Sequence, residues 1–209
     1  MELTAAKPRR KGLVQLYLDG EEAVKLDREV FLRAGLRPGD QISDEELHQL
    51  ILDSDARRAK EKALYLLEHR NHSKRELTEK IARTAASWEA AEAAAGQMEE
   101  LGLVDDQVYA RDRAREMFLR KRWGPLRVKQ ELRRKGIDGE LIEELLEEYR
   151  QRDEGGLVAE NVRAVLETKY SGWREDEKQR RRAFAALQRR GYSYEEIREG
   201  MAWDEFEAE

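Results

Sequence analysis

The chain has 209 residues, of which 41% are charged and 40% hydrophobic, with a formal net charge of -5 and a mean hydropathy of -0.90. This composition excludes one thick hydrophobic core and predicts a mostly α-helical protein whose helices each bury one stripe. Cysteine is absent, which excludes disulfides and thiolate metal sites. No long apolar run or leader-like segment occurs, so we expect a cytoplasmic protein without a membrane partner.

Residues 1–55 contain the only segment that resembles a β-hairpin. In residues 13–26, apolar and other side chains alternate before Asp19-Gly20, a two-residue turn signal. Because an isolated hairpin is marginal in water, we expect it to pack against helices. A short helix should follow and end near Gly35, where the chain gains a residue suited to a helix end.

From residue 43 onward, helix signals dominate. The pattern of a capping box, in which a serine and a glutamate three residues later bond each other's backbone N–H groups, occurs three times. The three pairs are Ser43 with Glu46, Ser73 with Glu76, and Ser193 with Glu196. Three occurrences predict three helix starts.

The chain also repeats itself. Residues 132–146 match residues 187–201 at an offset of 55, and a weaker match lies 51 residues earlier. Such self-similarity indicates stacked supersecondary units. We predict helices at about 106–120, 125–135 and 139–149 in the middle unit. The expected organisation is an N-terminal segment 1–55, which ends in the start of a long helix, and three-helix repeats at 56–104, 105–153 and 154–209.

The second helix of the middle repeat has clear end signals. Pro125 suits the first helical position, and Gly136 suits the left-handed position that follows the helix. Trp123 and Val128 occupy the two positions of a hydrophobic staple. In the first repeat, Ala85 stands where the later repeats have glycine.

Four segments in this order resemble the RecX family of recombinase regulators. They are "ALYLLEHRNHSKREL" (63–77), "MEELGLVDDQVYARDRARE" (98–116), "WGPLRVKQELRRKGI" (123–137) and "AALQRRGYSYEEI" (185–197). The resemblance covers roughly residues 56–202 and implies an elongated, curved array of three tandem three-helix repeats. It also implies a non-enzymatic regulator of DNA repair that binds the RecA filament and its single- and double-stranded DNA. Such a regulator would inhibit RecA ATPase and strand exchange.

The stretch from Arg111 to Lys135 is the best candidate for the binding surface. It holds 11 basic and 3 acidic residues, a local charge of +8 in an acidic chain. On a helix over 125–135, Arg127 and Arg134 lie opposite the apolar side, so we expect their removal to disturb little packing. The predicted RecA- or DNA-contacting residues are Arg111, Arg115, Arg122, Arg127, Lys129 and Arg134, with Arg181 in the third repeat.

Other readings of these patterns remain open. The basic stretch could be the solvated face of a helix. The chain could also be a helix-turn-helix transcription factor or a helical interaction scaffold. No phosphate-loop motif or paired catalytic carboxylates occur, so we expect no enzyme, cofactor or small-molecule substrate. His69 and His72 lack a third ligand nearby, so we expect no metal, and we expect the four tryptophans to serve as core or staple residues.

Overall fold

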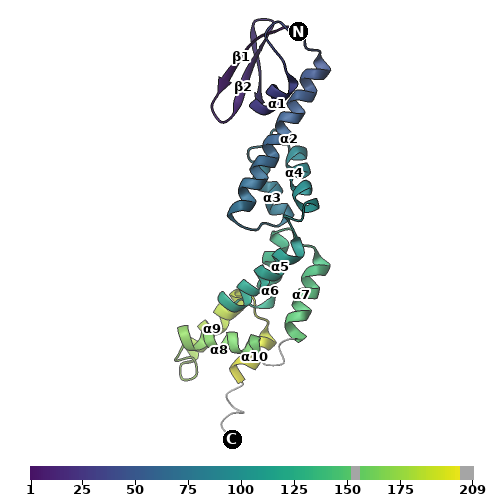
Figure 1. Ribbon diagram of the computed structural model, residues 1–209. Helices are drawn as coiled ribbons and strands as arrows, with labels where there is room; N and C mark the ends of the chain where they lie inside the picture. Colours follow the sequence, from purple (N-terminus) through teal and green to yellow (C-terminus); the bar gives the residue numbers. More distant parts are fainter. Residues whose placement is uncertain (152–155, 203–209) are drawn as a thin grey trace. The chain divides into compact units, whose positions relative to one another are not determined.

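The structure, a computed structural model, describes residues 1–151 and 156–202. These residues are mostly α-helical, with a small antiparallel sheet at the N-terminus (Figure 1), which confirms the predicted fold class. The chain divides into two compact units, Met1–Val104 and Asp105–Glu209. The predicted boundary at 153–154 and Trp203 lie outside the described residues.

The elements of the first unit are three strands and four helices. They are β1 (Leu3–Arg9), β2 (Leu13–Leu18), β3 (Glu21–Asp27), α1 (Arg28–Ala34), α2 (Asp44–His69), α3 (Lys74–Ala82) and α4 (Trp88–Glu100). The described elements of the second unit are a short π-helix and six α-helices. They are α5 (Asp106–Arg115), η1 (Glu116–Arg120), α6 (Pro125–Arg134), α7 (Gly139–Gln151), α8 (Leu157–Lys169), α9 (Glu177–Arg189) and α10 (Tyr194–Ala202).

The N-terminal sheet has the order β1-β2-β3, with both pairs antiparallel. The predicted hairpin is β2–β3, and its turn residues Asp19 and Gly20 both have positive φ, as a tight hairpin turn requires. The structure adds β1, which the sequence analysis did not predict. Pro8 lies in β1, opposite Val14, and a proline is tolerated there because β1 is an edge strand.

The sheet is held to the helices that follow it. Leu3, Leu16 and Leu26 are fully buried, and the half-buried Phe31 and Ile51 pack against their cluster from α1 and α2. Polar contacts reinforce this packing, because the Asp27 backbone N–H donates to Ser54 Oγ at 2.8 Å. The expectation that the hairpin packs against helices is therefore confirmed.

The first three-helix group consists of the second half of α2 with α3 and α4, around the buried Leu77, Ile81 and Met98. The Ser43–Glu46 capping box at the start of α2 has both of its predicted bonds. At the start of α3, Ser73 Oγ accepts from the Glu76 backbone N–H at 3.2 Å. These local signals placed both helix starts correctly.

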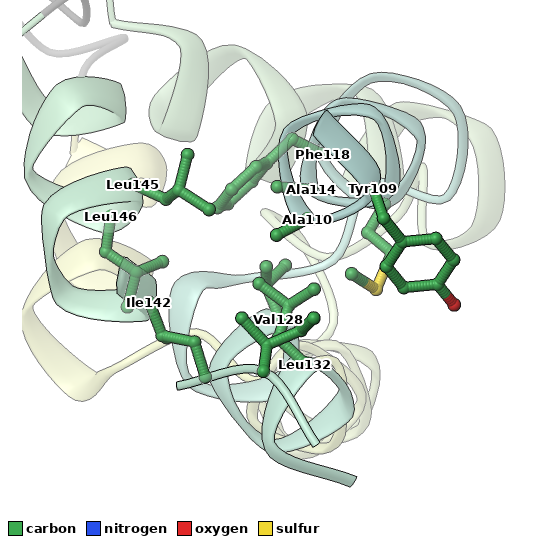
Figure 2. Packing of buried hydrophobic residues seen from close by; sticks show 11 residues of the cluster. Tyr109, Ala110, Ala114, Phe118, Val128, Leu132, Ile142, Leu145 and Leu146 are labelled. Carbon is green, nitrogen blue, oxygen red and sulfur yellow. The ribbon is translucent and has the colours of Figure 1, made fainter. Parts of the chain in front are cut away.

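Helices α5, α6 and α7 enclose the core of the second group. In Figure 2, side chains of three segments point into one cluster. They are Ala110 from α5 and Phe118 from η1, Leu132 from α6, and Leu145 from α7. The predicted helix 106–120 is correct in extent, but its last turn is the π-helix η1. Pro125 begins α6, and the predicted left-handed Gly136 follows it with a φ of 79°.

Helices α8, α9 and α10 form the third group, around Val162, Leu166 and Leu187. Helix α10 crosses close to α8, because a Cβ on Gly200 would lie 2.6 Å from Val162 Cγ1. Trp173 is buried in this cluster, as predicted for a core residue. Trp88 is 50% exposed, so its prediction as a core or staple residue is wrong. Trp88 is the first residue of α4, about one turn before Ala91, the first buried residue of that helix.

Candidate nucleic-acid interface

Within the second unit, residues 121–127 are hydrogen-bonded to residues 189–192, and we call this contact the seam. The Gly124 backbone N–H donates to the Arg190 carbonyl at 2.8 Å, and the Leu126 N–H donates to the Gly191 carbonyl at 3.1 Å. Arginine side chains add to these bonds, because Arg190 Nη1 donates to the Lys121 carbonyl at 3.1 Å. The seam therefore fixes the turn before α6 against the turn before α10.

Two glycines allow this close approach. A Cβ on Gly124 would lie 2.4 Å from the Gly191 carbonyl carbon. A Cβ on Gly191 would lie 2.4 Å from the Arg127 backbone nitrogen, and Gly191 itself has a φ of 89°. Both positions exclude larger residues, since neither backbone neighbour can move aside without breaking seam bonds.

Arg122 occupies an unusual backbone conformation beside the seam. Its φ is 50°, in the left-handed region that residues other than glycine rarely adopt. The hydroxyl of Tyr192 donates to the Arg122 carbonyl at 3.0 Å and holds this conformation. Burial raises the pKa of Tyr192 above its ordinary value, although Arg190 and Arg122 oppose the increase. The phenol therefore remains a donor.

Four of the seven predicted site residues are paired with carboxylates. Arg111 Nη2 lies 3.3 Å from Glu148 Oε1, and Lys129 pairs with Glu143 across α6 and α7. The hydrogen bond from Lys129 is the largest cause of the lowered pKa of Glu143. The remaining pairs lie within single helices, Arg134 with Glu131 and Arg181 with Glu177. Pairing weakens these cations as anion sites. The side chains of Arg111, Arg134 and Arg181 are nevertheless exposed, whereas that of Lys129 is only 28% exposed.

Arg127 has a structural position that the sequence analysis did not predict. Its guanidinium carbon lies 4.0 Å from the centre of the Trp123 ring, and its Nη1 donates to the Arg189 carbonyl at 3.1 Å. The expectation that Arg127 can be removed without disturbing packing is therefore wrong. Arg134 differs, because its side chain is 68% exposed.

Arg115 and Arg122 make no ion pair with any residue that the structure describes. Arg115 is exposed on α5, while Arg122 lines a hollow of about 290 Å³. The hollow also receives Arg120 and Lys121 from the same segment, and Lys169 and Arg190 from the third repeat. These four residues are not among the predicted site residues. Arg120 and Lys121 lie in the basic stretch 111–135, but Lys169 and Arg190 are distant from it in sequence. Arg190 reaches the hollow through the seam, and Lys169 reaches it from the end of α8.

Two further observations concern metal binding and membrane spanning. In the described part of the chain, no three His, Cys, Asp or Glu side chains are grouped as a metal site would require. No helix there is both long enough and apolar enough to cross a membrane. His72 is buried with its Nδ1 3.2 Å from Glu76 Oε2, so it is part of the packed α3 start.

Comparisons with known proteins agree with this architecture. A family model described as "RecX, second three-helix domain" matches residues 105–146, and one described as "RecX, third three-helix domain" matches residues 159–201. A protein of Stenotrophomonas maltophilia (strain R551-3) named "Regulatory protein RecX" is 34% identical over 145 residues, which are 69% of this chain and 85% of that protein. The protein of the same name from Geobacillus kaustophilus is 30% identical over 189 residues, covering 88% and 68% of the two chains.

Two solved structures have the same fold. "Crystal structure of regulatory protein RecX" aligns with a TM-score of 0.64 and 21% identity, over 95% of this chain and 98% of that one. "Crystal structure of RecX from Lactobacillus salivarius" aligns with a TM-score of 0.60 and 22% identity, over 70% and 94% of the two chains. At these identities the likeness concerns the fold.

Proposed function

Because the chain belongs to the RecX family of regulatory proteins, we propose that it binds the RecA–DNA filament and inhibits RecA ATPase and strand exchange. In this proposal the protein is a cytoplasmic, non-enzymatic regulator of recombination and DNA repair. It acts by occupying the nucleoprotein through cations of the second and third repeats, and needs no cofactor.

The observation that carries the proposal is the concentration of cations in one stretch of the second unit, residues 111–135, of an acidic protein. Residues 111–135 have a local charge of +8 although the whole chain has a charge of -5. A basic surface on an acidic protein favours contact with a polyanion at one place while discouraging general coating of DNA. Arg111 and Arg115, one turn apart on α5, are both exposed and belong to this surface.

Titration into RecA reactions tests the proposal. RecA, single-stranded DNA and ATP are incubated with increasing amounts of the protein, and ATP hydrolysis and strand exchange are measured. We expect both activities to decrease, while the protein alone hydrolyses no ATP. Unchanged RecA activities across the titration would refute the proposed function. Protection of a defined duplex sequence without RecA would instead indicate a transcription factor.

A pair of matched variants locates the surface. Arg111→Ala combined with Arg115→Ala should weaken inhibition, because it removes two exposed cations of the basic surface. The control, Arg33→Ala combined with Arg75→Ala, removes the same charge from exposed positions of the first unit. Equal loss of inhibition in both variants would show that only total charge matters and would exclude a surface on α5.

A further inference from the structure

We propose that the hollow between the two repeats of the second unit is a binding site for a single phosphate group. The hollow has a volume of about 290 Å³, which is ample for a phosphate with its hydration. Its charged lining residues are all cations. They are Arg120, Lys121, Arg122, Lys169 and Arg190. This proposal adds a specific site to the proposed function. It depends on the proposed function only where DNA is taken as the source of the phosphate.

The cations of the hollow are available to a ligand. Arg120, Arg122, Lys169 and Arg190 pair with no carboxylate in the described residues, in contrast to most predicted site residues. Lys121 is partly neutralised, since its Nζ lies 3.4 Å from Glu116 Oε1. Four like charges gathered around one hollow repel each other, and an anion between them would relieve that repulsion.

Two of the lining residues, Arg190 and Arg122, are held in place by hydrogen bonds of the fold. Arg190 is oriented by its bond to the Lys121 carbonyl, which leaves its other N–H groups for a second acceptor. The left-handed Arg122 is held by the Tyr192 hydroxyl. Strained backbone that its surroundings maintain is typical of ligand sites. Guanidinium groups, which present several donors in a plane, match the oxygens of a phosphate.

A second hollow, in the first unit, has a different arrangement of lining charges. The hollow in the first unit, of about 370 Å³, is lined by both signs of charge, including Asp27, Asp55 and Glu61 beside Arg58 and Lys62. Carboxylates at that position would repel a phosphate. Volume alone therefore does not distinguish the two hollows, but the sign of the lining charge does.

The test uses the full chain without RecA. The probes are a fluorescently labelled single-stranded oligothymidine, followed by anisotropy, and inorganic phosphate, followed by calorimetry and by competition with the oligonucleotide. The variant is Arg120→Ala combined with Lys169→Ala, because both side chains are exposed and make no bond that holds the fold. The matched control is Arg182→Ala combined with Arg198→Ala, which removes the same charge from exposed positions of α9 and α10.

We expect the variant to bind the oligonucleotide roughly tenfold more weakly than the parent, as for the loss of charge-assisted hydrogen bonds. The slope of log K against log salt should decrease by about 0.7, the value for one phosphate of a single strand. The control should bind within about twofold of the parent, because distant exposed charges act only through a screened field.

The outcomes separate the sources of the phosphate. Competition by inorganic phosphate that disappears in the variant would support a site for free phosphate as well as DNA. Weaker oligonucleotide binding by the variant, with no effect of inorganic phosphate on the parent, would support a site for the phosphodiester alone. Equal binding by parent and variant, equal loss in the control, or no binding of either probe to the parent would overturn the proposal.

The RecA assays remain independent of this test. A protein that binds phosphate in the hollow but leaves RecA unchanged would refute the proposed function and keep the site. A protein that inhibits RecA but binds neither probe in the hollow would refute the phosphate site and keep the proposed function.

Discussion

Replacement of Gly191 by alanine should weaken the second unit through the seam. The left-handed backbone of Gly191, with a φ of 89°, would cost an alanine about 1–2 kcal/mol. The new Cβ would also lie 2.4 Å from the Arg127 backbone nitrogen, so the two chain segments must separate. Separation breaks the hydrogen bonds at Gly124 and Leu126, worth about 0.5–1.5 kcal/mol each. We therefore expect a total loss of about 2–5 kcal/mol.

Urea unfolding, followed by tryptophan fluorescence, measures this loss. The background should carry Trp88→Phe, since Trp88 belongs to the first unit and is half exposed, so that the signal reports the second unit. Gly156→Ala is the matched control. Gly156 also has a positive φ, 75°, but an added Cβ would meet only Ala159 Cβ at an ordinary 3.8 Å. The control should lose only the backbone strain, about 1–2 kcal/mol. If Gly191→Ala loses no more than the control, the seam does not stabilise the unit.

Three further changes test other parts of the structure. Leu132→Ala should cost roughly 2–5 kcal/mol in the free energy of unfolding, because Leu132 is fully buried, and urea midpoints that match the parent would contradict this. Asn161→Ala should cost about 1–3 kcal/mol by the same assay, since Asn161 Nδ2 donates to the buried Phe118 carbonyl at 3.1 Å. Burial, partly opposed by Glu76, holds the pKa of His72 below its ordinary value, so the unfolded chain binds more protons there. Stability should fall as the pH drops from about 6.5 through the lowered pKa. Because His72 lies in the first unit, the urea midpoint is measured with Trp88 retained, and His72→Gln should reduce its dependence on pH.

The features that the sequence predicted correctly depend on residues close together in the chain. Ser43 and Glu46 satisfy each other's backbone within one turn, and Pro125 starts α6 because its ring already has a helical φ. Gly136 ends the same helix for a reason equally local, its positive φ. Such signals are complete within a few residues, so distant partners do not change them.

The features that the sequence did not predict depend on distant partners. Strand β1 contains Lys7, Pro8 and Arg9, a poor strand sequence that becomes a strand because β2 offers it an edge. The π-helix η1 replaces the last α-helical turn, and Asn161, which follows 43 residues later, caps the Phe118 carbonyl there. Neither partner can be recognised from periodicity.

The same contrast between local signals and distant partners applies to the single cations of the candidate site. A count of charges treats Arg127 and Arg122 alike, but the first stacks on Trp123 and bonds a carbonyl, while the second faces a hollow without a carboxylate. What separates them is the partner that each guanidinium has already found within the fold. Arg190 belongs to both classes, since one of its N–H groups holds the seam while the rest of its guanidinium lines the hollow. A variant of Arg190 would therefore disturb both structure and binding, whereas Lys169, exposed at the end of α8, reports binding alone.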